Sequence, residues 1–187
     1  MTNTLKLTAV SCLIMAFGSS VQAQESYVGI GAGAFNVGTG VSKKAVGGGY
    51  LQLGNDFSEF VGVEVRAGAS GKTGEELTLQ PRTGIDWFAA AYLKPRYQIS
   101  EQLTGYALLG VATIRASYSE PGLIKQTKTR TGYAYGLGLQ YRIAENYSLS
   151  GEWSHMLSKP KTNATAIKTQ FKGLEASMFT LNGKYHF

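Results

Sequence analysis

The sequence has few charged residues, one cysteine and few prolines, and these shortages limit the classes of protein that it can encode. Only 16% of its 187 residues are charged, whereas disordered chains are rich in charge and poor in aromatic residues. The single Cys12 excludes a disulfide framework and a cysteine-based metal site. Apolar runs of about 18 residues, which a membrane-spanning helix needs, do not occur beyond the N-terminus. The length leaves room for one folded domain.

The N-terminus has the pattern of a secretory signal peptide. Residues 1–6 carry one positive charge, residues 7–18 are apolar, and residues 21–23 supply the small side chains at which a signal peptidase cleaves. Cleavage after Ala23 removes residues 1–23 and leaves 24–187 as the exported domain.

Glycine and tyrosine are abundant, and they occur in segments that alternate with a period of two. The chain has 24 glycines and 11 tyrosines. In residues 61–69, Val and Ala occupy one face of a predicted strand, while Gly, Glu64 and Arg66 occupy the other. Residues 132–143 repeat this division, with Tyr, Leu and Ile on one face. Each strand therefore has an apolar, aromatic face and a small or polar face.

Segment length separates a membrane barrel from a soluble sandwich. Strands that span a membrane need about 9–11 residues. Eight segments of about that length are predicted, at roughly 26–36, 45–54, 59–70, 85–98, 103–117, 131–143, 147–157 and 174–187. Short turns at 55–58, 100–102 and 144–146 alternate with longer connections at 37–44, 71–84, 118–130 and 158–173. This alternation is typical of outer-membrane barrels, so we predict an all-β, eight-stranded, antiparallel up-and-down transmembrane barrel with its small and polar face inside.

The last segment ends on an aromatic residue. Phe179, Leu181, Gly183, Tyr185 and Phe187 share one face, and Phe187 is the final residue. This arrangement resembles the terminal signature of Gram-negative outer-membrane proteins. The resemblance implies that the barrel-assembly machinery is a partner, through Phe187.

Three stretches resemble one family over essentially the whole exported domain. The hairpin at 94–110, the segment 135–146 and the closing residues 181–187 are similar to the eight-stranded transmembrane domain of the OmpA-like family, which includes small opacity-type proteins. The resemblance implies a monomer in the Gram-negative outer membrane without a cofactor. It also implies a structural and interfacial role in membrane integrity, lipopolysaccharide contact and adhesion.

The resemblance further implies a network of charges inside the barrel. Glu64 and Lys94 fall where the family has a carboxylate and an ammonium, but Gln140 and Ser150 replace an acid and a base that relatives often carry. The network is therefore smaller, or rebuilt from other residues with inward parity: Arg66, Arg96, Arg142, Glu152 and Lys184. We expect these charges to satisfy one another, because eight strands leave an interior just wide enough for side chains. A narrow pore of low conductance is the alternative.

A second alternative is a hydrolase. Some eight-stranded barrels are lipid A deacylases, in which a histidine activates a serine two residues away. His155 has Ser154 beside it, but Leu157 stands where that serine is needed. Glu175 shares the outward parity of His155, whereas Ser158 does not. We therefore expect no catalytic residue and interpret His155 as an interfacial polar side chain.

Nucleotide and metal sites are not indicated. Gly71-Lys72-Thr73 does not complete a phosphate-binding loop, because Arg66 stands where the motif needs a glycine. Neither histidine has the spacing of a metal ligand. We expect no metal and no nucleic-acid partner.

Charge is distributed unequally between the two kinds of connection. The short turns carry Asp56, Glu101 and Glu145, whereas the long connections carry an excess of Lys and Arg. The last long connection has four lysines and no acid: Lys159, Lys161, Lys168 and Lys172. A basic rim of this kind is suited to lipopolysaccharide phosphates or to an anionic host or matrix surface.

Overall fold

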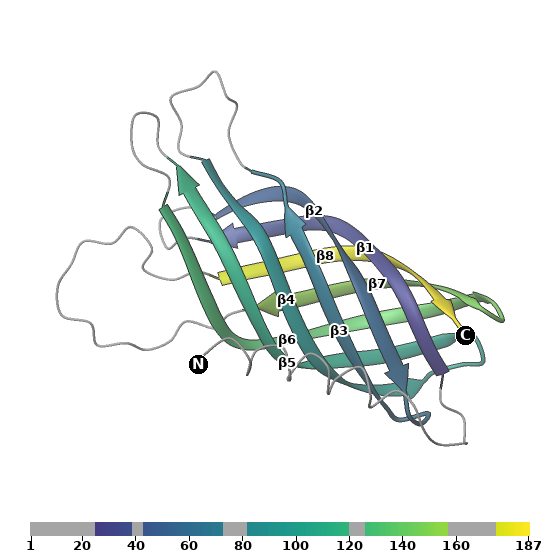
Figure 1. The fold of residues 1–187 in the computed structure, drawn as a ribbon. Coiled ribbons are helices and arrows are strands. Elements are labelled where there is room, and N and C mark those ends of the chain that lie inside the picture. Colours follow the sequence, from purple (N-terminus) through teal and green to yellow (C-terminus); the bar gives the residue numbers. More distant parts are fainter. Residues whose placement is uncertain (1–24, 39–42, 73–81, 120–125, 157–174) are drawn as a thin grey trace.

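In the computed structural model, eight antiparallel strands close into a barrel (Figure 1). The structure describes residues 25–38, 43–72, 82–119, 126–156 and 175–187. The strands are β1 (Glu25–Gly38), β2 (Lys43–Asp56), β3 (Val61–Ser70), β4 (Arg82–Gln98), β5 (Leu103–Ser119), β6 (Gln126–Ala144), β7 (Tyr147–Met156) and β8 (Glu175–His186). Within these ranges, no helix has the length and hydropathy to cross a membrane. The predicted fold is confirmed.

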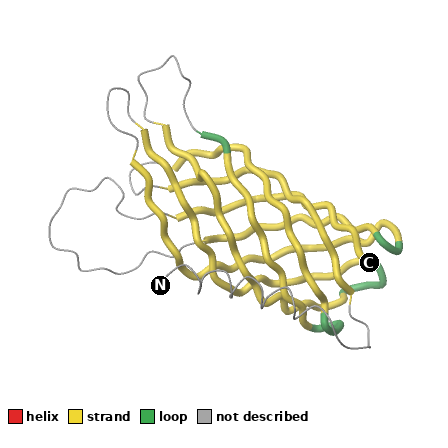
Figure 2. Tube along the Cα trace, in the orientation of Figure 1, coloured by secondary structure: helices red, strands yellow, loops and turns green. Residues whose placement is uncertain are grey.

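The strands are staggered around the barrel. Each strand pairs with the next, and β8 pairs with β1. Following cross-strand partners from Tyr27 through all eight strands leads back to β1 at Val37, ten residues further along (27 to 37). Such a stagger tilts the strands relative to the barrel axis, as the lattice of crossing chains in Figure 2 shows.

The barrel has two different ends. Short turns at 57–60, 99–102 and 145–146 lie at one end, which we name the turn end. The connections β1–β2, β3–β4, β5–β6 and β7–β8 leave from the opposite end, which we name the loop end (Figure 1). The predicted signal peptide, residues 1–23, and the four lysines of the last connection lie outside the described residues.

The outer wall carries the apolar face of the strands, as predicted. Tyr133, Leu137 and Leu181 are more than 60% exposed, while their immediate neighbours in sequence are less so. Phe187 is also exposed and packs edge-on against Tyr185. A wall of exposed leucines and aromatic rings is the surface that a lipid bilayer requires.

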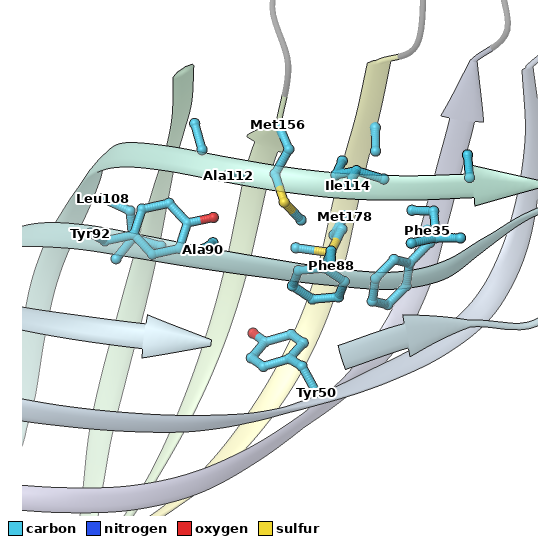
Figure 3. Packing of buried hydrophobic residues seen from close by; sticks show 14 of the residues in the cluster. Phe35, Tyr50, Phe88, Ala90, Tyr92, Leu108, Ala112, Ile114, Met156 and Met178 are labelled. Atoms are coloured by element: carbon cyan, nitrogen blue, oxygen red, sulfur yellow. The ribbon is translucent and has the colours of Figure 1, made fainter. Parts of the chain in front are cut away.

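The inner wall differs from the prediction near the loop end. Instead of small or polar side chains, this half of the lumen holds a packed apolar cluster, which we name the apolar plug (Figure 3). Its large aliphatic and phenylalanine members are Phe35, Ile85, Phe88, Leu108, Ile114, Met156 and Met178, and the rings of Tyr50, Tyr92 and Tyr106 also belong to it. The two strands on which the prediction was based, β3 and β6, contribute little to this cluster. The pattern of two strands was therefore wrongly extended to the whole lumen.

Strands β4, β5 and β6 extend further toward the loop end than predicted. β4 begins at Arg82 and β6 at Gln126, so parts of the predicted connections 71–84 and 118–130 are strand. The extension is stabilised by burial of inward Ile114 and Ala116. Outward threonines favour the extended backbone as well.

Candidate functional site: the lumen network and the outer surface

Glu64 lies at the centre of the charged part of the lumen. Its carboxylate accepts a hydrogen bond from Arg66 Nε, and Lys184 Nζ lies 3.5 Å from Oε2. The hydroxyl of Tyr27 donates to the same carboxylate at 2.5 Å. All four side chains are buried. Alternation on β3 aims both Glu64 and Arg66 inward, which is why residues two apart form a pair.

Arg66 connects Glu64 to the opposite side of the lumen. Its Nη1 and Nη2 donate to the two oxygens of Glu152 at 2.5 and 2.6 Å. This two-pronged contact is the geometry in which guanidinium binds carboxylate most strongly. The guanidinium also lies 4.9 Å from the ring centre of Tyr50 and 5.1 Å from that of Tyr92. Two carboxylates and two aromatic rings therefore fix the position of the Arg66 guanidinium.

Asp56 forms a second centre nearer the turn end. Lys94 Nζ lies 2.8 Å from its Oδ1, and Arg96 Nη1 binds Oδ2. The prediction placed Asp56 in a short turn, and that position was wrong. β2 continues to Asp56, whose inward carboxylate is closer to both cations.

Tyrosine hydroxyls connect the two centres. Lys94 Nζ donates to the Tyr27 hydroxyl at 2.7 Å, and that hydroxyl donates onward to Glu64. Tyr106 donates to Glu152 at 3.0 Å. Lys184 also donates to Gln140 at 3.3 Å, and Asn182 donates to Ser150 at 3.2 Å. The two polar residues that replace charged ones in relatives thus accept hydrogen bonds within the same network.

Two glycines make room for the tyrosines. Gly54 lies opposite Tyr27, and Gly138 lies opposite Tyr106. A Cβ at Gly138 would come within 2.7 Å of two ring atoms and the hydroxyl oxygen of Tyr106, so only glycine lets the ring lie flat against the neighbouring strand. Inward parity predicts these tyrosines, but the cross-strand register that matches each with a glycine is not visible in the sequence.

The turn end has a more exposed pair. Arg142 Nη2 donates to both oxygens of Glu25, at 2.8 and 2.7 Å. Glu25 also lies 3.5 Å from His186 Nδ1. Of the predicted lumen residues, Glu64, Arg66, Glu152 and Lys184 form one cluster. Lys94 and Arg96 form a second with Asp56, and Arg142 forms this third.

The lumen therefore has two zones. The zone toward the turn end is filled by paired charges, and the zone toward the loop end is filled by the apolar plug. An ion that crossed would have to break the pairs and then enter an apolar layer without compensating groups. Among the described residues, no cluster of His, Cys, Asp or Glu is arranged to hold a metal.

The described residues do not assemble a hydrolase site around His155. Ser154 points into the lumen and is fully buried, whereas the His155 ring packs on Tyr135 on the outer wall. The outward serine opposite His155 is Ser177, and no hydrogen bond between their side chains is present. Leu157, Ser158 and the side chain of Glu175 lie outside the described residues.

Comparisons with known proteins agree with this architecture. The Yersinia pestis attachment invasion locus protein Ail, solved in complex with the heparin analogue sucrose octasulfate, has a TM-score of 0.62 and 20% identity, over 89% of this chain and 100% of that chain. Neisserial surface protein A has a TM-score of 0.67 and 12% identity, over 87% and 97%. The N-terminal barrel domain of Pseudomonas aeruginosa OprF has a TM-score of 0.54 and 14% identity, over 86% and 97%.

At these identities, the likenesses show the fold alone. A search of curated protein sequences finds no match. A family model, described as the outer membrane protein beta-barrel domain, matches residues 9–187. This confirms the predicted resemblance to small outer-membrane barrels and gives no support to a lipid A deacylase. The chain belongs to the outer membrane protein beta-barrel domain family, which implies an outer-membrane location.

Proposed function

We propose that this protein acts through its surfaces, as a structural outer-membrane barrel whose long connections bind anionic polysaccharide at the cell surface. The observation that carries the proposal is the filled lumen, in which Glu64, Arg66 and Glu152 are paired beneath the apolar plug. A narrow pore, the alternative, would need an interior that water and ions can enter. We therefore assign ligand binding to the outer surface of the barrel and its long connections.

The charge of the long connections indicates the class of ligand. The connection at 158–173 carries four lysines and no acid. Lysine ammonium groups attract phosphate and sulfate groups, and each contributes about 1 kcal/mol near an anionic surface. The complex of Ail with a sulfated heparin analogue supports a polyanionic ligand for a barrel of this shape. Lipopolysaccharide and sulfated host or matrix polysaccharides share this chemistry.

Two further parts of the proposal concern assembly. Phe187 directly follows β8 on the outer wall, and its backbone N–H donates to the carbonyl of Ser26 on β1, where the barrel closes. We propose that the barrel-assembly machinery recognises this exposed aromatic residue. We also propose that the folded protein is a monomer whose predicted signal peptide, residues 1–23, is removed during export.

The test removes the positive charges of the last long connection. Replacing Lys159, Lys161, Lys168 and Lys172 with glutamine should weaken binding to immobilised heparin and flatten its salt dependence. Replacing the same four with arginine is the matched control, and it should preserve both. Equal heparin binding by the glutamine variant and the wild-type protein would contradict the proposal.

A further inference from the structure

A groove of about 540 Å³ runs along the outer wall across β2, β3, β4 and β5. Two neighbouring rows of cross-strand partners form it, Leu51–Ala67–Ala89–Thr113 and Leu53–Val65–Ala91–Val111. The residues at the ends of each row are larger than the alanines between them, and Val65 is the one larger residue in the middle. Leu51, Leu53 and Val111 are at least half exposed and stand as walls, while the alanines of β3 and β4 form a low floor. The volume lies in the range of ligand-binding pockets.

A cation lies at the end of the groove that is nearest the loop end. Arg115 follows Thr113 on the outward face of β5, is exposed, and pairs across the ladder with Trp87 of β4. A register shift between Ile85 and Trp87 puts Ile85 in the plug and Trp87 on the outer wall. No described residue forms a hydrogen bond or ion pair with the Arg115 guanidinium.

Hydroxyl groups lie between the cation and the apolar floor. Thr113 and Thr131 face outward and share a hydrogen bond of 2.9 Å. Tryptophan marks the boundary between the acyl chains and the headgroups of a bilayer. The groove therefore lies at acyl-chain depth, the threonines lie near the boundary, and Arg115 lies at headgroup level. From the groove toward the loop end, the outer wall thus presents apolar side chains, then hydroxyl groups, then a cation.

We propose that this groove binds lipid A of the outer leaflet, with one acyl chain along the alanine floor and a phosphate on Arg115. Guanidinium binds phosphate with two parallel hydrogen bonds, and an unpaired arginine above an apolar groove matches a lipid that carries both groups. Lipid A is the occupant because Arg115 lies on the side of the groove toward the loop end, which faces outward in the proposed function. The inference rests on the proposed function in that respect and specifies its lipid contact.

The experiment measures retention of lipid by the purified full chain in detergent, with native mass spectrometry. The probes are hexa-acylated bisphosphoryl lipid A, its monophosphoryl form and phosphatidylglycerol. Arg115→Gln should weaken retention of bisphosphoryl lipid A about tenfold, the loss expected for a charge-assisted hydrogen bond. Ala91→Phe, which fills the floor, should weaken retention of both forms of lipid A.

Ala34→Phe is the matched control, because Ala34 is an exposed outward alanine of β1 that does not line the groove. It should retain lipid A as the wild-type protein does. The wild-type protein should prefer the bisphosphoryl form, and Arg115→Gln should lose that preference. Shifted migration of unheated samples on gels verifies that each variant is folded.

Two results would overturn the assignment. One is unchanged retention of lipid A by both Arg115→Gln and Ala91→Phe. The other is phosphatidylglycerol binding as tightly as lipid A. The glutamine variant of the four lysines separates this inference from the polysaccharide proposal, since it should lose heparin binding and still distinguish the two forms of lipid A through Arg115.

Discussion

At the scale of single residues, the lumen depends on buried charges that have no alternative to their partners. Glu64, Arg66 and Glu152 have side chains without measurable exposure, so water cannot solvate a charge whose partner is removed. Removing one member of a buried pair costs far more than the pair itself contributes to folding. The lumen network is therefore sensitive to single substitutions.

Replacement of Glu64 tests this sensitivity. Glu64→Ala leaves Arg66 and Lys184 without one of their acids and should lower the free energy of unfolding by roughly 3–5 kcal/mol. The free energy of unfolding is measured by denaturant titration in lipid vesicles, with tryptophan fluorescence as the signal. Glu101→Ala, at an exposed position in a short turn, is the control and should change little. Equal effects of the two substitutions would indicate that water reaches Glu64.

Gly138 gives a steric test at the same scale. Gly138→Ala should push the Tyr106 ring off the neighbouring strand and lower the free energy of unfolding by about 1–3 kcal/mol. Gly151→Ala is the matched control, because a Cβ there would have only an ordinary contact with Leu181 on the outer wall. If both variants unfold at the same denaturant concentration, the glycine–tyrosine match has no energetic importance.

At the scale of strands, some strands are longer than the sequence predicts, at both ends of the barrel. Lys128 and Arg130 fall within a predicted connection, yet both lie in β6 and pair with β5. Asp56 falls within a predicted turn, yet it ends β2 and binds Lys94. In each case a contact with another part of the barrel, either the apolar plug or a cation, stabilises strand in residues that the sequence predicts to be loop or turn.

Limited proteolysis tests the strand limits and the orientation together. Trypsin added to intact cells should cleave in the last long connection, where the four lysines lie, and should spare Lys128 and Arg130, because paired strands resist proteolysis. Glu-C added to intact cells should not reach Glu59 at the turn end, but should cut there once the membrane is opened. Cleavage after Glu59 on intact cells would reverse the orientation.

Strand number, antiparallel order and the outward faces were predictable from the sequence, because period-two alternation and turn spacing are local properties. The pairing within the lumen was not. Which cation reaches Glu64 or Asp56 depends on the ten-residue stagger of the barrel, and that stagger is fixed by contacts among all eight strands. The apolar plug escaped prediction because its residues come from seven strands, each contributing only one to five.

At the scale of the whole molecule, the two zones make the barrel a sealed body in the membrane. The charged zone excludes apolar solutes, and the apolar plug excludes ions. The proposed function accordingly assigns the protein's interactions to its outer wall and its loop end. Sealing of the lumen therefore distinguishes this structural barrel from a pore, which needs an interior that ions can cross.

Planar-bilayer recording of the purified protein tests sealing most directly. The wild-type barrel should show no steady ion conductance. A variant in which Phe35, Phe88 and Met178 are all changed to serine should conduct more than one in which outward Phe179, Leu181 and Leu137 are changed, because only the first variant opens the apolar plug. Steady conductance by the wild-type protein, unaltered by changes in the plug, would show that the lumen is not sealed.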